Sequence, residues 1–125
     1  MTQDQTLKLM DEFAKAFNRH DRPALESMMT EDGVFETSSG PDSFGIRHTG
    51  REAIGKAFEA VWTMYPDAIW DNAEHSAMGD RGFSEWTFRG TDAKGNKVEV
   101  RGCDLFIFRD GKIARKDSFR KNRVK

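Results

Sequence analysis

The chain has 125 residues, the usual length of one compact domain. Its 20 Lys and Arg residues against 21 Asp and Glu residues give a formal charge of -1, so no overall positive field draws it to nucleic acid or an anionic membrane. No apolar run approaches the ~18–20 residues of a membrane span, no signal-peptide pattern opens the chain, and the single Cys103 excludes an internal disulfide. These features predict a single cytoplasmic domain over residues 1–125.

Two helices are predicted near the N-terminus. Apolar residues spaced by three and four between Leu7 and Phe17 form one stripe on the first helix. Thr2 and Gln5 have the spacing of a capping box ahead of it. Asp21 as an N-cap and Pro23 in the first turn begin a second, shorter helix.

A third helix is predicted after Thr49. Thr49 and Glu52 have the spacing of a capping box, and the apolar residues of 53–62 follow at helical intervals. Pro66 disfavours helical backbone in the residue before it, so the helix is expected to end by Tyr65.

A long loop is predicted between the second and third helices. Val34 to Glu36 is typical of a short strand, and Thr37 to His48 contains the glycines, serines and proline of a loop. Loops of about 12 residues are often functional in compact domains. His48, at the end of this loop, could gate a pocket or lie on the surface.

The second half of the chain has the period of two that is typical of strands. Four strands are predicted at Ile69 to Met78, Gly82 to Arg89, Lys97 to Phe108 and Lys112 to Phe119, with turn residues between them. Consecutive strands of this kind form an antiparallel meander. The predicted class is therefore α+β, with the helices covering one face of the sheet.

Three segments carry a family resemblance: Phe17-Asn18-Arg19-His20-Asp21, Thr49-Gly50-Arg51-Glu52-Ala53-Ile54, and Phe106 to Ile113 with its Asp-Gly turn. Together with the order of elements, they resemble the nuclear transport factor 2-like superfamily, in particular its SnoaL-like polyketide cyclase and ketosteroid isomerase branch. The resemblance implies a cone-shaped domain, in which a curved antiparallel sheet wraps around three N-terminal helices and encloses an apolar pocket. It also implies a homodimer. Members include isomerases, cyclases and noncatalytic binding modules.

The resemblance to ketosteroid isomerase extends to one of three active-site positions. Asp104 matches the protonated oxyanion-hole aspartate. Phe13 stands where the isomerase has its tyrosine, and Thr37 where it has its general base, so steroid isomerisation by the known route is not expected. Glu36 could replace that base only if the strand end twists. Asp117 resembles the last-strand aspartate of SnoaL-like cyclases.

The Asp110-Gly111 turn decides whether two acids meet. A two-residue turn places Asp104 opposite Asp117 on one side of the sheet, where repulsion would keep one carboxyl protonated and create an acid/base couple. A three-residue turn sends Asp117 to the other face, among solvated basic residues. Arg115 would neutralise an acid or bind an anionic substrate. Asp104 interrupts an apolar strand, which favours a place in the pocket.

The predicted function is that of a small enzyme performing acid/base chemistry on a small apolar carbonyl or hydroxyl compound, without metal or organic cofactor. Asp104 and Asp117 are the predicted catalytic residues. The predicted substrate-binding residues are Phe13, Phe17, Phe58, Trp62, Trp86, Phe106 and Arg115. The alternative is a noncatalytic module that binds an apolar ligand or dimerises, and Cys103, Leu105 and Ile107 supply an apolar sheet face for a homodimer.

Other candidate sites have weaker patterns. His75, with Glu74 and Asp71, lacks the spacing of a metal site. Cys103 has no recognisable catalytic partner and is expected to be a packed thiol. Arg109 to Lys125 holds eight basic and two acidic residues, net +6, but lacks the interleaved aromatics of a nucleic-acid surface. We expect neither a metal nor nucleic acid to bind.

Overall fold

The first helix follows its sequence signals closely. The computed structural model describes residues 1–124. In it, α1 spans Gln3–Asn18, and the Thr2–Gln5 capping box is formed in both directions. The buried stripe of this helix includes Met10, Phe13 and Phe17, which face the sheet.

The other two helices differ in how they begin. Helix α2 spans Arg22–Met28, and the Asp21 side chain accepts a hydrogen bond from the amide of Ala24, as predicted. Helix α3 spans Arg51–Met64. Its predicted Thr49 cap is wrong, because Thr49 lies in a strand and Gly50, with φ of 90°, is the N-cap without a side-chain hydrogen bond.

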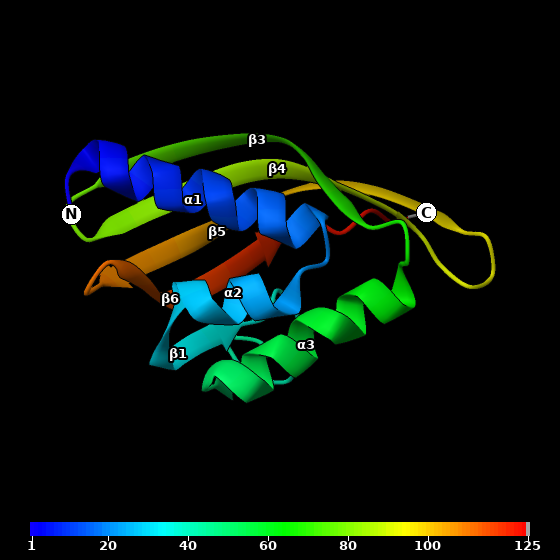
Figure 1. Ribbon diagram of the computed structural model, residues 1–125. Coiled ribbons are helices and arrows are strands. Elements are labelled where there is room, and N and C mark those ends of the chain that lie inside the picture. The colour runs from blue at the N-terminus through cyan, green and yellow to red at the C-terminus, as the bar shows by residue number, and fades with distance from the viewer. Residues whose placement is uncertain (125) are drawn as a thin grey trace.

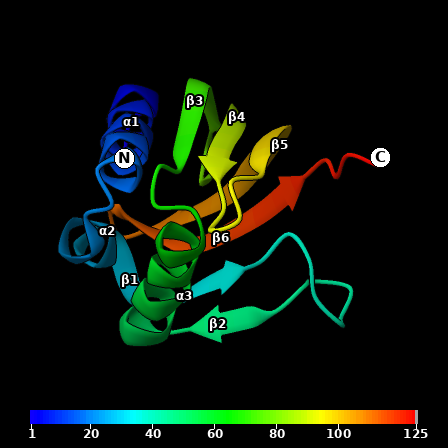
Figure 2. The same ribbon diagram turned by 90° about the vertical axis from the view of Figure 1, so that its right-hand side faces the viewer.

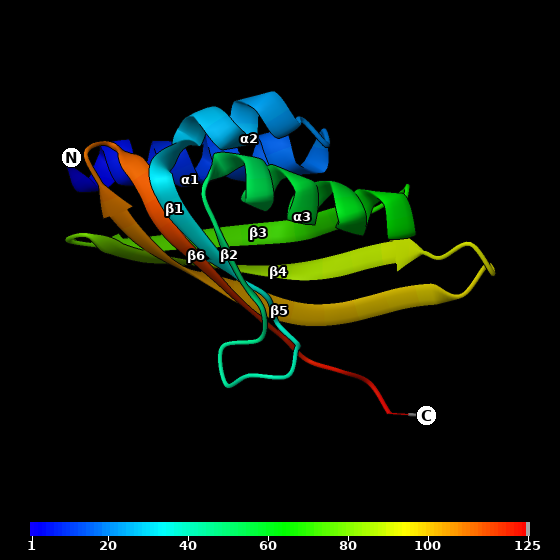
Figure 3. The ribbon, with the colours of Figure 1, turned by 90° about the horizontal axis from the view of Figure 1, so that it is seen from below.

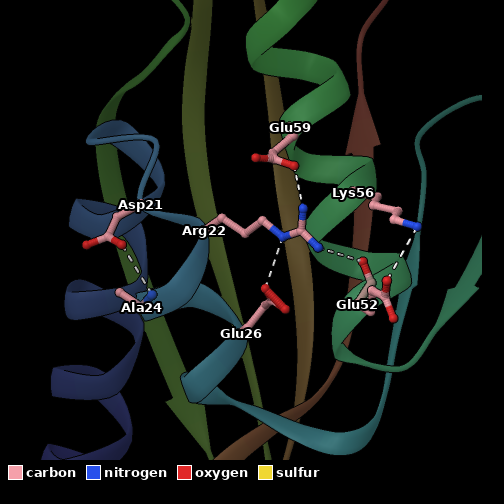
Figure 4. Close-up of polar contacts among 7 residues, drawn as sticks. All are labelled: Asp21, Arg22, Ala24, Glu26, Glu52, Lys56 and Glu59. Carbon is pink, nitrogen blue, oxygen red and sulfur yellow. Dashed lines mark hydrogen bonds and ion pairs between the residues drawn. The ribbon is translucent and has the colours of Figure 1, made fainter.

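The guanidinium of Arg22 joins α2 to α3 (Figure 4). Its Nε donates to Glu26 Oε2 at 3.0 Å, one terminal nitrogen pairs with Glu59, and the other donates to the Glu52 carbonyl at 3.3 Å. Gly55 makes this approach possible, since a Cβ there would lie 2.3 Å from Arg22 Nε. The two helices are thereby fixed as one layer over the sheet.

A six-stranded curved sheet wraps around the helices (Figures 1 and 2). Its strands are β1 Met29–Glu36, β2 Arg47–Thr49, β3 Ile69–Met78, β4 Arg81–Thr91, β5 Lys97–Arg109 and β6 Lys112–Arg120. The spatial order is β2-β1-β6-β5-β4-β3. The predicted four-strand meander is confirmed, but β1 pairs with β6 in parallel, so the sheet is mixed.

The segment between the second and third helices is more ordered than predicted. Strand β1 begins at Met29 instead of Val34, and the predicted loop ends early because Arg47 to Thr49 pairs with β1. The remaining loop projects beside the C-terminal end of β6 (Figure 3). Lys125, the last residue of the basic segment, lies outside the described residues.

The hairpin between β5 and β6 contains a turn that was predicted and a bulge that was not. Asp110 and Gly111 form a two-residue turn with φ values of 54° and 73°, and Phe108 pairs with Ile113 as expected. Ala114 is then an extra residue, because Ile107 pairs with Arg115. This bulge moves every later residue of β6 by one position relative to β5.

Aromatic side chains fill the space between the helices and the sheet. Phe58 of α3 is fully buried and lies within 6.5 Å, between ring centroids, of Phe13, Phe17, Phe35 and Trp62. Helix α1 covers β3, whereas α3 lies against β1 and β2 (Figure 2). No helix within residues 1–124 is long and apolar enough to cross a membrane.

Candidate functional site

A buried polar cluster lies on the inner face of the sheet. Asp104 comes from the middle of β5, Trp86 from β4, and Lys116 and Ser118 from β6. The pairing of Asp104 with Ser118 follows directly from the Ala114 bulge. Because side chains alternate along a strand, Lys116 and Ser118 both point inward on either side of Asp117.

The carboxylate of Asp104 is the centre of this cluster. It is 7% exposed and accepts three hydrogen bonds. The donors are Trp86 Nε1 at 3.0 Å, Lys116 Nζ at 3.2 Å and Ser118 Oγ at 2.6 Å. The arrangement holds the carboxylate in a fixed position beside the ammonium group.

Lys116 is a buried cation surrounded by aromatic rings. It is 6% exposed, and its Nζ lies 4.6, 5.1 and 5.5 Å from the ring centroids of Phe35, Phe17 and Phe58. An ammonium group has three donors. Two of them reach Asp104 and Ser118, and the third has no protein acceptor among residues 1–124. The site therefore keeps one charged donor for a ligand.

An open cavity of about 360 Å³ adjoins the cluster. Lys116 and Ser118 form part of its polar wall, and Phe17, Phe35, Phe58 and Trp86 form much of its apolar wall. The ring of His48 also lines it, stacked on Phe35 with centroids 5.9 Å apart. This volume falls within the range of ~300–1,000 Å³ that small-molecule sites occupy.

Asp104 itself faces a smaller hollow. This space, about 30 Å³, lies between α1 and the sheet and is lined by Phe13, Phe106 and His75 as well as Asp104. It has room for a water molecule but not for an organic ligand. Lys116 is thus the charged group that separates Asp104 from the larger cavity.

His75 closes one side of the smaller hollow. Its Nδ1 is 2.7 Å from Ser84 Oγ, and its Nε2 is 3.9 Å from a carboxylate oxygen of Asp11. Burial lowers the pKa of His75 below its ordinary value of 6.5, and the Asp11 carboxylate opposes this shift. Burial therefore favours the neutral imidazole beside the cluster.

The predicted substrate-binding residues divide between the two spaces. Phe58 lines only the larger cavity and Phe13 and Phe106 only the smaller one, whereas Phe17 and Trp86 lie between them and line both. Trp62 lines neither: its ring packs in the core and stacks on His20 at 4.9 Å. His20 is half-buried, and its Nε2 lies 2.9 Å from the Ala68 carbonyl.

The predicted pairing of Asp104 with Asp117 is wrong. The extra residue at Ala114 places Asp117 opposite Leu105, on the outer face of the sheet. There Asp117 accepts a hydrogen bond from Arg115 at 3.1 Å. The two carboxylates therefore do not form the expected acid/base couple, although the turn that was to produce it is present.

Arg115 belongs to an outer cluster and not to the cavity. It contacts Glu36 at 3.3 Å as well as Asp117, and Arg47 donates two further hydrogen bonds to Glu36. Glu36 is buried and neutralised by both guanidinium groups. The strand does not twist it inward, so Glu36 does not replace the base that Thr37 lacks.

Sequence reasoning missed Lys116, Ser118 and Phe35. Lys116 lies in a strongly basic segment, and a segment of this kind is usually interpreted as a solvent-exposed strand. The bulge at Ala114 conceals its inward direction, because counting outward from the turn assigns the inner position to Arg115. One usable signal was the alternation of Lys116, Ser118 and Arg120, since all three share one face.

The other reactive side chains among residues 1–124 show no arrangement for nucleophilic or metal chemistry. Burial raises the pKa of the Cys103 thiol, and the negative charge of Asp104 adds to this effect, so the thiol is a poor nucleophile. Within residues 1–124, no group of three or more His, Cys, Asp or Glu side chains is arranged to hold a metal ion.

A family model and solved structures match this chain. The profile of the SnoaL-like domain matches residues 10–116. A candidate polyketide cyclase from Xanthomonas campestris pv. campestris superposes with a TM-score of 0.85 at 24% identity, covering 96% of this chain and 92% of that one. A nuclear transport factor 2-like protein of unknown function from Mesorhizobium loti reaches 0.79 at 32% identity, covering 96% and 93%.

A third solved structure contains a small molecule. It is a protein with a ketosteroid isomerase-like fold from Catenulispora acidiphila, in complex with trimethylamine. Its TM-score is 0.79 at 19% identity, and the alignment covers 89% of this chain and 83% of that one. A comparison with curated protein sequences finds no match.

Proposed function

The chain belongs to the SnoaL-like domain family of the nuclear transport factor 2-like superfamily, and from this premise we propose that it is an isomerase- or cyclase-type enzyme acting on a small, apolar carbonyl compound. The observation that carries the proposal is the third N–H of Lys116, which has no acceptor among residues 1–124 and borders an apolar cavity. A donor in this place suits a carbonyl oxygen.

Lys116 would stabilise the oxyanion that develops on the substrate. When a proton leaves the carbon beside a carbonyl, negative charge moves to the carbonyl oxygen, and a fixed charged donor stabilises it. Asp104, behind Lys116, is a positioning residue that holds the ammonium in place with Ser118. This revises the predicted role of Asp104, which was to contact the oxyanion directly.

His48 is the proposed proton acceptor. Its imidazole lines the same cavity as Lys116 and is held against Phe35. The proton removed from carbon passes to the imidazole, and the enolate is either reprotonated at another carbon or attacks a second carbonyl. These two outcomes are isomerisation and ring closure. The catalytic role predicted for Asp117 has no support from its place on the outer face.

The proposal is tested by the exchange of α-protons of 2-tetralone in D2O, followed by proton NMR. The protein is expected to accelerate exchange above the buffer rate, and Lys116→Met to reduce that acceleration roughly 10²–10³-fold, the usual effect of removing one oxyanion donor. Lys121→Met removes the same charge from an exposed position and is the matched control, with no expected change.

A noncatalytic binding module is the second candidate. The observation that favours it is the complete pairing of the Asp104 carboxylate, which leaves no free acid on the wall of the cavity. If 2-tetralone binds with chemical-shift changes at the cavity but its α-protons exchange at the buffer rate, the enzyme proposal is wrong and the binding module stands.

A cytoplasmic homodimer is also part of the proposal. Phe83, Leu105 and Phe119 are exposed on the outer face of the sheet, where a second copy would cover them. Sedimentation at micromolar concentration is expected to show twice the 14.3 kDa mass, and Leu105→Glu to give the monomer. Lys94→Glu, in the β4–β5 turn, should leave the dimer intact. If the wild-type protein sediments only as a 14.3 kDa species, the proposed homodimer is wrong.

A further inference from the structure

Arg120 is the third residue of an inward-facing polar row on β6. Lys116, Ser118 and Arg120 alternate along the strand, and all three line the larger cavity. With a rise of about 3.3 Å per residue, the Cα atoms of Lys116 and Arg120 are about 13 Å apart. The row therefore extends along the wall of the cavity from the buried ammonium to the end of β6.

The guanidinium of Arg120 has no anionic partner among residues 1–124. Its central carbon lies 5.2 Å from the centroid of Phe88, an inner-face residue of β4, and its Nε is buried without a hydrogen-bond acceptor. By contrast, Arg47 and Arg115 on the outer face both pair with carboxylates. A buried donor left unsatisfied is uncommon and calls for an explanation.

The residue opposite Arg120 is a glycine, and its missing side chain leaves room for the Trp86 indole on the inner face. Gly102 is its Cα partner on β5, and a Cβ at Gly102 would lie 2.5 Å from the Trp86 ring. The indole thus occupies the space of the missing side chain. Arg120 also borders an outer hollow of about 400 Å³ with Cys103, but its contact with Phe88 places the guanidinium on the inner side.

We infer that Arg120 binds a carboxylate of the substrate in the cavity, at the end of β6. This inference rests on the proposed function and narrows the substrate to a small apolar oxo acid, whose carbonyl meets Lys116 and whose carboxylate meets Arg120. The fork of a guanidinium matches a carboxylate with two parallel hydrogen bonds. A dianionic phosphate fits less well, because Asp104 already neutralises Lys116.

The test compares 2-naphthoate with 2-naphthamide, which have the same ring system but differ in charge. Isothermal titration calorimetry is expected to give at least tenfold tighter binding of the acid by the wild-type chain. Arg120→Gln should remove this preference and leave the affinity for the amide within twofold. Arg120→Lys should retain part of it, because the charge remains but the fork is lost.

Arg101→Gln is the matched control, since it removes the same charge from an exposed position on the outer face of the neighbouring strand. It should bind both ligands as the wild type does. Equal affinity of the wild type for acid and amide overturns the inference, and so does a preference that persists in Arg120→Gln. In either case the proposed role of Lys116 is unaffected, because the exchange of the α-protons of 2-tetralone tests it separately. If neither ligand binds, the inference is overturned, and the exchange assay then decides the proposed function on its own.

Discussion

The Asp104→Leu variant is expected to lose about 3–5 kcal/mol of its free energy of unfolding, because it leaves Lys116 as a buried charge without a counterion. Both side chains are at most 10% exposed, so water does not replace the missing partner. The Trp86 indole and the Ser118 hydroxyl lose the same acceptor, and buried donors without acceptors add to the loss. Urea unfolding followed by tryptophan fluorescence measures it.

A double-mutant cycle separates the ion pair from simple packing. Lys116→Met is expected to be as destabilising as Asp104→Leu, because it leaves the carboxylate unpaired. The double variant should recover most of the stability, since two packed apolar side chains can replace a buried ion pair at little net change. Losses that simply add in the double variant would show that the two charges are not coupled.

The exposed Glu85→Leu substitution on β4 is the control for this cycle. It removes a carboxylate from the outer face and is expected to change the free energy of unfolding by no more than about 0.5 kcal/mol. The same cycle separates stability from chemistry, because the double variant should remain folded yet lose the exchange activity attributed to Lys116.

Local signals were sufficient to predict most of the fold. The N-terminal ends of α1 and α2 depend on Thr2, Gln5 and Asp21, whose side chains cap backbone groups within a few residues. The last four strands follow alternation and turn residues, and the Asp110-Gly111 turn adopts the two-residue form that such a sequence favours. Each of these features is determined by neighbours in the sequence.

Features that depend on distant residues were not predictable. Strand β1 pairs in parallel with β6, about 80 residues later, and nothing near Met29 indicates that partner. The Thr49 cap failed because β2 pairing holds Thr49 in an extended strand, which leaves Gly50 to begin α3. Tertiary pairing here overrides a local helix signal.

The carboxylate of the candidate site was predictable from the sequence, but its buried ammonium was not. Asp104 interrupts an apolar strand at an inward position, so its burial follows from alternation. The burial of Lys116 depends on the single extra residue at Ala114, which changes which face each later side chain of β6 occupies. The alternation within β6 is regular, and only its register relative to β5 could not be predicted from the sequence.

The side chain that supports this site most directly from the helices is Phe58. It is completely buried, lines the larger cavity, and presents its ring to Lys116 Nζ at 5.5 Å. The Phe58→Ala variant is expected to lose free energy of unfolding near the lower end of the ~3–5 kcal/mol range for buried aromatic residues. The lower end applies because the new space joins an open cavity that water can enter.

Two controls distinguish the packing of Phe58 from the general loss of an aromatic ring. Phe119→Ala removes an exposed ring from the outer face and should cost well under 1 kcal/mol in the monomer, measured in the Leu105→Glu background. Phe58→Leu keeps part of the volume and should lie between the two. If Phe58→Ala were no more destabilising than Phe119→Ala, the ring would not support the core. The Phe58→Ala variant should retain the ion pair between Asp104 and Lys116, because Phe58 takes no part in it. It should bind 2-tetralone more weakly, because part of the apolar wall of the cavity is lost.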